Sequence, residues 1–516
     1  MDTLIPEQSA HHDRRWLILP VLCLSVFLVV VDNTIVNVAL PSLSRDLGAS
    51  TTQLQWIVDG YSLSFAGLLL AGGGVGDRLG RKGTMQVALV FFGVFSLFAA
   101  LSTSTVELIS ARVLMGVAAA FIFPATLAIL TSIFTDHSER QKALGIWGAT
   151  SGIAVAFGPI VGGALLEHYW YGSIFLVNIP IVLVTLLAGH YLIPVVGEQL
   201  RHKFDTIGVL LSTVGVTLLV FAIIQGPDWG WTSVGTLASF AGAAVFLVAF
   251  CLKELRTAMP LLDVRVFAIP RFSAGAGAIA VAFFCLFGFI FVITQYFQFV
   301  KGYSTLSAGV HTLPFAIVSA VFTPIGAVLA LKIGTRIVVA GGLVLMAGGL
   351  VLAGVSSTPT AAYFGPVIIA MCLLALGLSF ITAPATEAVM GSIKMEQVGA
   401  AAAVNNTTRE LGGTLGVAVI GSAFASAYGP KLLKGFAPYP IPQGARSAAS
   451  QSVAAALEVV HRAPAAVQAT LRLDAFDAFT SGLRLACMVA AGVAIVGAIF
   501  AAVFLPGRRG ANATPG

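Results

Sequence analysis

Residues 73–82 read Gly-Gly-Val-Gly-Asp-Arg-Leu-Gly-Arg-Lys, and they separate two apolar stretches that are each long enough to cross a membrane. A weaker copy, Ala-Val-Leu-Ala-Leu-Lys-Ile-Gly-Thr-Arg, occupies residues 327–336 in the same setting. A glycine and basic residues recur in register in the two segments. Weak internal repeats of this kind are typical of membrane proteins in which two related helical bundles enclose a site near the middle of the bilayer.

The composition is that of a membrane protein, because 58% of the 516 residues are hydrophobic and 10% are charged, with a mean hydropathy of +0.95. Soluble domains carry about 25% charged residues. Apolar stretches of about 20 residues, enough to cross a hydrocarbon core as a helix, recur along nearly the whole chain. The first stretch follows Arg14 and Arg15 without a cleavage pattern after it, which predicts a retained span. We therefore expect an all-α integral membrane protein.

The hydropathy pattern predicts fourteen transmembrane helices near 16–40, 54–76, 84–102, 107–130, 143–166, 173–194, 206–225, 234–252, 272–297, 306–330, 337–354, 362–391, 398–427 and 484–506. The repeat pairs spans one to six with spans nine to fourteen and leaves spans seven and eight as an insertion. The expected domains are a cytoplasmic N-terminus (1–15), an N-terminal six-helix bundle (16–200), two linker helices (201–271), a C-terminal six-helix bundle (272–506) and a cytoplasmic tail (507–516).

One predicted extracytoplasmic loop, residues 428–483, is long and rich in Ala, Ser and Pro, with a short surface helix expected from Ala448 to Val460. It is either a cap over the outer mouth or a plain connector.

Basic residues set the predicted orientation. Eighteen of them, from Arg14 to Arg509, fall in the segments that face inside if the N-terminus is cytoplasmic, against Arg45 and Lys301 in the short outer loops. This positive-inside bias predicts that both termini face the cytoplasm across a plasma membrane. The net charge of +6 then reflects topology, and no nucleic-acid partner is expected.

Ionisable residues inside predicted spans are few, and each is a candidate for function because a charge in mid-span costs about 2.5–3.5 kcal/mol on insertion scales. Asp32, Asp59 and Arg112 fall at similar depth in the outer half of the first bundle, so we expect them to line one cavity. Asn33 and Asn37 add polar partners on the helix of Asp32. The second bundle contributes Glu387, Arg409 and Glu410, of which Glu387 is close enough to the inner end for a plain interfacial carboxylate.

A buried carboxyl group of this kind either holds a proton or faces a cation, so the two ligands compete. Asp59 and Asp32 are the leading candidates for proton coupling and cation binding, with Arg112 as a partner that holds a carboxylate or positions a water. The alternative is a purely structural ion pair. Glu410 is a second cation or proton site, or it has a structural role.

Aromatic residues and missing motifs complete the pattern. Trp56, Tyr61, Phe123 and Trp147 form an expected aromatic wall for a flat cation, or they are packing residues. There is no phosphate-binding loop, no His-Glu-x-x-His pair and no nucleophile elbow, and the five cysteines are scattered singly. We therefore expect no enzyme activity, no cofactor, no metal and no ATP hydrolysis.

Taken together, these segments resemble the drug:proton antiporter-2 family of the major facilitator superfamily, with fourteen spans, and most closely its QacA-like quaternary-ammonium exporters. The matching stretches are 31–41, 53–63, 73–82, 111–116 and 158–163. The resemblance implies the major facilitator fold, two six-helix bundles plus two inserted central helices. It also implies proton-coupled export of lipophilic cations, such as quaternary ammonium compounds and ethidium-like dyes, by alternating access.

Residue roles carried over from the family include an acid at Asp59 tied to coupling. The gating motif falls on Gly73, Asp77, Arg78, Gly80 and Arg81, and the antiporter motif on Gly158, Pro159, Gly162 and Gly163. Expected partners are small lipophilic cations, protons and membrane lipid, with a functional monomer.

The chain departs from the family at Ser319, Asn405 and Asn406, where QacA-like members carry acids, and at Trp170-Tyr171-Gly172. Two alternatives remain at this point: a dedicated exporter of an endogenous antibiotic, lipid or siderophore, or a transport-inactive membrane binding protein.

Overall fold

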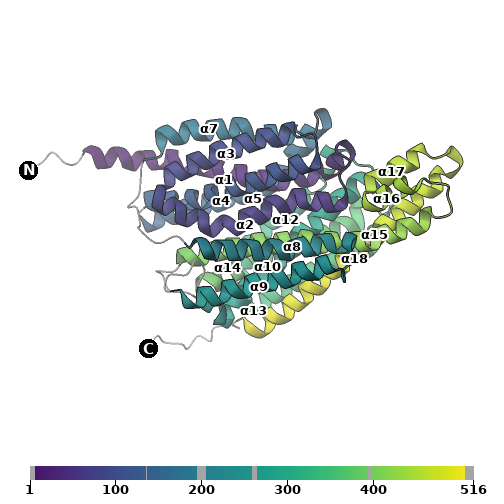
Figure 1. The fold of residues 1–516 in the computed structure, drawn as a ribbon. Helices are drawn as coiled ribbons and strands as arrows, with labels where there is room; N and C mark the ends of the chain where they lie inside the picture. The colour runs from purple at the N-terminus through teal and green to yellow at the C-terminus, as the bar shows by residue number, and fades with distance from the viewer. Residues whose placement is uncertain (1–5, 135, 195–204, 258–263, 393–397, 506–516) are drawn as a thin grey trace, which may run out of the picture.

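The computed structural model describes residues 6–134, 136–194, 205–257, 264–392 and 398–505, and every regular element in these ranges is a helix (Figure 1). Of the predicted cytoplasmic ends, 1–15 and 507–516, residues 1–5 and 507–516 lie outside the described residues, and residues 6–15 belong to a helix that begins at Pro6. The start of helix α1 and the end of helix α18 lie at one end of the molecule. We name this the inner end and the opposite one the outer end, following the orientation that the basic residues predict.

The helices fall into two bundles with a pair between them. The first bundle contains α1 (Pro6–Asp46), α2 (Thr51–Leu79), α3 (Arg81–Leu101), α4 (Thr105–Ile133), α5 (His137–His168), α6 (Ser173–Leu176) and α7 (Asn178–Leu192). The pair is α8 (Thr206–Trp229) and α9 (Val234–Arg256). The second bundle contains η1 (Val264–Ala268), α10 (Pro270–Gln295), η2 (Tyr296–Val300), α11 (Thr305–Val310), α12 (Leu313–Ile333), α13 (Thr335–Ser356), η3 (Tyr363–Val367), α14 (Ile368–Met390), α15 (Val398–Phe436), α16 (Gln443–Gln451), α17 (Val453–Arg462) and α18 (Ala465–Phe504).

Within the described residues, thirteen helical segments are long and apolar enough to cross a membrane. The second predicted span corresponds to α2, whose 29 residues reach about 43 Å at 1.5 Å per residue. The described helices therefore accommodate all fourteen predicted spans. Their outward faces carry large apolar side chains, such as Phe98 on α3 and Val245 on α9, as expected where lipid replaces water.

The internal repeat is visible in the packing. In the first bundle α2 packs on α4, α1 on α5 and α3 on α7; in the second, α12 packs on α14, α10 on α15 and α13 on α18. The turns of the repeat also match, because Gly80 has φ +98° between α2 and α3 and Gly334 has φ +97° between α12 and α13. A residue with a side chain rarely adopts this conformation, which explains the glycine in both copies.

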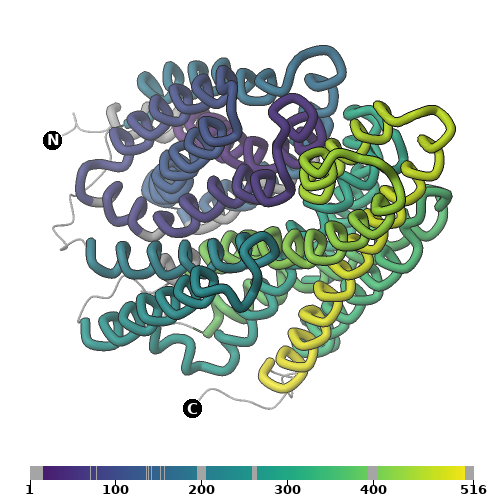
Figure 2. The backbone as a smooth tube through the Cα atoms, turned by 45° about the vertical axis from the view of Figure 1, so that its right-hand side comes forward, coloured from purple at the N-terminus to yellow at the C-terminus, as the bar shows by residue number. Residues whose placement is uncertain are grey.

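The segment predicted as a long outer loop is largely helical. Helix α15 continues to Phe436 and α18 begins at Ala465, with the short helices α16 and α17 between them. This part projects beyond the other helices at the outer end in Figure 1, and it is turned toward the viewer in Figure 2. The single helix predicted over 448–460 is wrong, because the chain breaks at Ser452, whose side chain caps α17. The projecting part also reaches the first bundle, since the Ser452 hydroxyl lies 2.9 Å from that of Ser44.

Candidate functional site

Near the outer end, the two bundles are joined by hydrogen bonds between α2 and α15 and between α1 and η2. The Gln55 side chain donates to the carbonyl oxygens of Val417 and Ala418 at 3.3 and 3.0 Å. The Gln298 side chain donates to the Val38 carbonyl at 2.8 Å. We call this set of contacts, together with the α5–α11 contacts described next, the outer seam.

The residues of the expected antiporter motif build the other side of the outer seam. A Cβ on Gly158 would lie 2.1 Å from Thr34 Oγ1 of α1, so a larger residue would require α1 or the Thr34 side chain to shift. Gly162 packs on Ile35 of the same helix in a similar way. A Cβ on Gly309 of α11 would lie 2.3 Å from the Pro159 carbonyl oxygen, and Gly163 meets the backbone of α11. Small residues thus allow α1, α5 and α11 to pack backbone against backbone.

A cavity of about 310 Å³ lies between the bundles on the inner side of the outer seam. Its walls come from α1, α2, α4 and α5 on one side and α10, α14 and α15 on the other. Glu410 precedes Val417 on α15 by seven residues, about 10 Å of helix, which sets the depth of the cavity below the seam. Glu410 and its neighbour Arg409 are half-buried, and both line the cavity.

One wall of the central cavity is aromatic. The rings of Phe65 and Phe123 lie 5.9 Å apart, and those of Phe123 and Trp147 lie 5.2 Å apart in an edge-on arrangement. Across the cavity, Phe283 and Phe287 of α10 stack at 6.1 Å. Aromatic side chains therefore line the cavity from both bundles.

Two ionisable residues, Glu410 and Arg409, line the cavity within the described residues. The guanidinium of Arg409 is held against the second bundle, since it lies 5.2 Å above the Phe283 ring and donates to Thr386 Oγ1 at 3.4 Å. The remaining polar side chains are Asn33, Thr34, Thr382 and Asn406. The Glu410 carboxyl is therefore the acidic group of this cavity among the described residues.

Asp32 lies outside the cavity, in a fully buried ion pair. Arg112 Nη1 donates to Asp32 Oδ2 at 2.5 Å, and both side chains are 0% exposed. Asn178 of α7 donates to the other carboxylate oxygen at 2.8 Å. Arg112 is itself fixed by the Ile57 carbonyl at 3.1 Å and lies 4.2 Å above the Tyr61 ring. Both carboxylate oxygens of Asp32 therefore have a hydrogen-bond donor, and one of these donors is the positively charged Arg112.

Asp59 is equally buried, at 0% exposure, but neither of its carboxyl oxygens has a hydrogen-bond partner among the described residues. Its helical position explains this. Trp56 and Leu63, which lie three residues before and four after it, pack on α8, and Gln55 bonds to α15. Residues at these spacings share a helix face. Asp59 therefore lies on the face of α2 that packs against α8 and α15, where Val220 and Ala418 belong to an apolar cluster.

The expectation that Asp32, Asp59 and Arg112 line one cavity is therefore not met in this conformation. Arg112 turns to Asp32, and none of the three residues borders the central cavity. The two asparagines near Asp32 also separate. Asn33 borders the central cavity, and Asn37 borders a second, smaller one of about 50 Å³.

Only some residues of the expected aromatic wall line the central cavity. Phe123 and Trp147 border the cavity, whereas Trp56 packs on Phe221 of α8 and the Tyr61 hydroxyl donates to the Val29 carbonyl. Sequence reasoning missed Phe283 and Phe287. Their i, i+4 spacing on a span of the second bundle was the available signal. It also missed Asn178, a polar residue within the sixth predicted span.

The residues of the gating motif lie around the turn between α2 and α3. Gly73 is in α2, Gly80 forms the turn, Arg78 is exposed, and Arg81 donates to the Ala128 carbonyl of α4 at 3.0 Å. The side chain of Asp77 lies outside the described residues. Glu387 is exposed near the inner end of α14, in line with an interfacial position.

The chain resembles known proteins in sequence and solved transporter structures in fold. The chain is 35% identical to the multidrug efflux pump LfrA of Mycolicibacterium smegmatis over 96% of this chain and 98% of that protein. It is 32% identical to a tetracenomycin C resistance and export protein of Streptomyces glaucescens (96% and 92% covered) and 34% identical to the methyl viologen resistance protein SmvA of Salmonella typhimurium (80% and 83%).

Among solved structures, a bacterial homologue of the human lysosomal transporter Spinster, crystallised inward-facing and unoccupied, matches with a TM-score of 0.64 at 16% identity, over 95% of this chain and 96% of that one. This likeness supports the fold alone. Residues 22–417 match the family model of the Major Facilitator Superfamily. The predicted fold class and family are therefore confirmed: the chain belongs to the Major Facilitator Superfamily and is a multi-pass membrane transporter.

Proposed function

We propose that this protein is a drug/proton antiporter that exports lipophilic cations by alternating access. The observation that carries the proposal is the contrast between a central cavity with an acid and an aromatic wall, and a separate buried acid without a partner. The relatives support drug export as the class of activity, because their names are those of efflux and resistance proteins. One of them is named for methyl viologen, which is itself a cation with two quaternary nitrogens.

Substrate binding is assigned to the central cavity. Glu410 supplies the negative charge, and the rings of Phe123, Trp147 and Phe287 supply apolar and cation–π contacts for a delocalised cation. Quaternary ammonium compounds and ethidium-like dyes fit this chemistry. The proposal names this class of compounds and does not select one native substrate within it.

Proton coupling is assigned to Asp59. An ionised carboxylate without a partner is very costly in an apolar junction, so in this conformation the group holds a proton. Asp59 lies one helical turn from Gln55, which joins α2 to α15 in the outer seam. Separation of the two helices would open the junction and expose Asp59 to the outer side, where protons are exchanged. The matched pair of Asp32 and Arg112 stays structural in this scheme.

Export of a cation against the membrane potential requires a positive ion to enter in exchange. Moving one positive charge out against a membrane potential costs about 2.3 kcal/mol per 100 mV. Entry of at least one proton per monovalent cation offsets that cost. A plasma-membrane location with both termini inside, as predicted from the basic residues, gives the proton gradient the right direction.

The test uses purified protein in proteoliposomes with ethidium as substrate. With an imposed proton gradient, the wild type should accumulate ethidium uphill, whereas Asp59→Asn should not. Both proteins should still exchange ethidium across the membrane at equilibrium, since the substrate cavity is intact. Glu458→Gln, an exposed acid on α17, is the matched control and should behave as wild type. Uphill accumulation by Asp59→Asn that equals wild type would show the coupling assignment to be wrong.

A second candidate is a dedicated exporter of one endogenous antibiotic. Arg409 favours it, because a guanidinium beside Glu410 also offers a site to an anionic or neutral polar ligand. The relative named for tetracenomycin C export points in the same direction. Failure of ethidium and other organic cations to exchange at all, with exchange of an acidic aromatic compound, would favour this candidate.

A further inference from the structure

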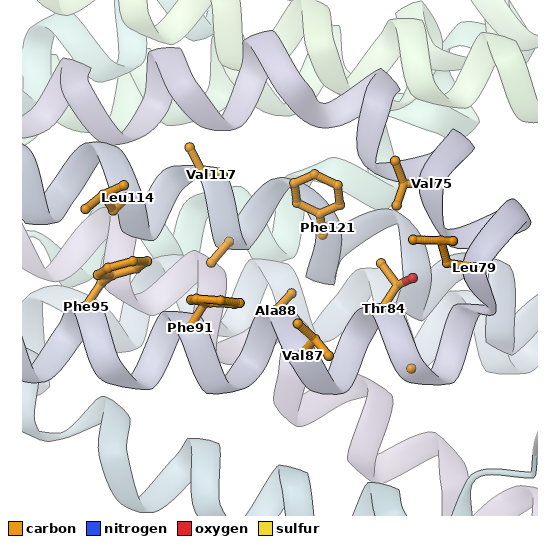
Figure 3. A pocket seen from close by; sticks show the side chains of 12 residues that line it. Val75, Leu79, Thr84, Val87, Ala88, Phe91, Phe95, Leu114, Val117 and Phe121 are labelled. Carbon is orange, nitrogen blue, oxygen red and sulfur yellow. The ribbon is translucent and has the colours of Figure 1, made fainter. Parts of the chain in front are cut away.

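Besides the central cavity, the described residues enclose a large groove and a small compartment. The groove, of about 580 Å³, lies between α2, α3 and α4 on the flank of the first bundle, and apolar side chains such as Phe91 and Phe121 line it (Figure 3). The compartment, of about 50 Å³, lies between the two bundles, with walls from α1, α5, α10, α12 and α14. We call it the outer compartment. None of the chemistry described above uses it.

The outer compartment continues the central cavity toward the outer end. On α1, Asn33 borders the central cavity and Asn37 borders the compartment, one helical turn or about 6 Å further out. Val155 of α5 borders both spaces. Val38 and Pro159 also border the compartment, and their carbonyl oxygens take part in the outer seam. The compartment therefore lies between the proposed substrate cavity and the seam.

Asn37 brings an unpaired acceptor to the outer compartment. The residue is 1% exposed, and its amide nitrogen donates to the carbonyl oxygens of Asn33 and Thr34 at 3.3 and 3.4 Å. Because a carbonyl oxygen only accepts, these contacts fix the amide nitrogen on that side and the amide oxygen on the other. Asn37 Oδ1 is buried and has no hydrogen-bond partner among the described residues. A buried acceptor without a partner is costly, so a group that donates to this oxygen is stabilised.

The other polar side chains of the compartment have the same character. Thr294 donates its hydroxyl proton to the Ile290 carbonyl at 2.7 Å, and Thr312 donates to the Gly309 carbonyl at 2.6 Å. Both hydroxyl oxygens therefore keep only the capacity to accept. The remaining side chains of the lining are apolar, such as Phe315. A hydrogen bond inside the compartment thus requires a donor that the ligand supplies.

The size of the compartment limits what enters it. One water needs about 10–15 Å³, so this space takes a group of a few heavy atoms but no aromatic ring. We propose that the outer compartment is a hydrogen-bond-accepting subsite for an amino group of the exported cation, whose ring occupies the central cavity. Cations with an N–H donor are then preferred over cations of the same shape without one. The inference rests on the proposed export function and adds a substrate preference to it.

The test compares two cations that differ in their N–H donors. Ethidium carries two amino groups, and its deaminated analogue has the same rings and the same charge without them. Each protein is reconstituted in proteoliposomes, and the half-saturating concentration of each compound is measured by equilibrium exchange, which needs no proton gradient. Asn37→Leu removes the unpaired acceptor and keeps the approximate size of the side chain. Thr294→Val removes a second acceptor with little change of shape.

Asn405→Leu is the matched control. Asn405 is also buried, at 4% exposure, and its Oδ1 also has no hydrogen-bond partner among the described residues. It borders neither the central cavity nor the outer compartment. This variant should therefore not discriminate between ethidium and the deaminated analogue.

Asn37→Leu should raise the half-saturating concentration of ethidium about fivefold, the effect of one lost hydrogen bond, and leave that of the analogue unchanged. Thr294→Val should cause a smaller rise with the same selectivity, and it decides the matter if Asn37→Leu does not fold. An unchanged value for ethidium would mean that the compartment holds only water, and equal rises for both compounds would mean a structural role. Either result overturns the subsite. Exchange of neither compound by the wild type would instead refute the proposed function, and the subsite with it.

Discussion

Asp32 and Asp59 lie in the same bundle, at similar depth, and are equally buried, yet their surroundings are opposite. Asp32 has Arg112 on one carboxylate oxygen and Asn178 on the other. Asp59 has no partner on either oxygen among the described residues, and it lies on the face of α2 that packs on the apolar cluster of α8 and α15. The comparison teaches that burial alone does not assign a role to an acid in a membrane. A matched charge fixes helices in place, whereas the unmatched acid is the one to which we assign proton exchange.

The largest expected effect falls on the matched site. Arg112→Gln leaves the Asp32 carboxylate buried without its counter-charge, which should lower the free energy of unfolding by about 3–5 kcal/mol. Denaturant titration of the purified protein, followed by tryptophan fluorescence, measures this loss. The double variant Asp32→Asn with Arg112→Gln should recover most of it. A loss below about 1 kcal/mol for the single variant would mean that the ion pair does not hold the bundle together.

The next effect tests whether the outer seam shields Asp59. In Gly309→Ala the new Cβ meets the Pro159 carbonyl, a backbone atom that cannot turn aside, so the seam should be destabilised by about 1–3 kcal/mol. In the background of Asp59→Cys, this change should speed labelling by a membrane-impermeant thiol reagent added from the outer side.

Gly348→Ala is the control for that experiment, since a Cβ there meets no atom within 4 Å. Its labelling rate should equal that of Asp59→Cys alone. If Gly309→Ala labels no faster than this control, then the seam does not limit access to Asp59.

A smaller effect is expected for Glu410, the acid of the central cavity, and it concerns substrate affinity instead of stability or coupling. Glu410→Gln removes the negative charge of the central cavity but keeps the shape of the side chain. The concentration of ethidium for half-maximal transport should rise about tenfold, which corresponds to about 1.4 kcal/mol. An uncharged aromatic substrate should be affected little. An equal rise for charged and uncharged substrates would assign a structural role to Glu410.

The smallest effect is on the stability of the unmatched site. Asp59→Asn replaces a neutral carboxyl group by a neutral amide of the same shape, so the free energy of unfolding should change by less than about 1 kcal/mol. Asp32→Asn, which leaves Arg112 buried without its counter-charge, should cost several times more in the same titration. Equal losses for the two variants would remove the distinction between the two acids.

The two inserted helices have a structural role beside Asp59. The inserted helix α8 contacts α2 of the first bundle and α15 of the second, and its Val220 and Ile224 complete the apolar junction around Asp59. Hydrogen bonds anchor it on both sides, from Thr213 to the Gly67 carbonyl and from Ser422 to the Ile223 carbonyl. A bundle pair without this insertion would leave that face of α2 to lipid.

The sequence by itself determined the spans, the internal repeat and the short set of intramembrane charges, because hydropathy and backbone conformation are local properties. Gly80 and Gly334 illustrate this, since a turn with positive φ is specified by one residue type. The domain boundaries and the residue roles remain predictions that these observations support.

Only the tertiary structure decided which charges meet. Asp32 and Arg112 are 80 residues apart in the chain, Asp32 and Asn178 are 146 apart, and nothing local distinguishes Asp59 as the acid left without a partner. The choice depends on which faces of α1, α2 and α4 the close glycine contacts bring together, as at Gly116 against the Tyr61 carbonyl. Helix packing in a membrane is set by such long-range fits of small residues, and these leave almost no trace in the hydropathy of a single span.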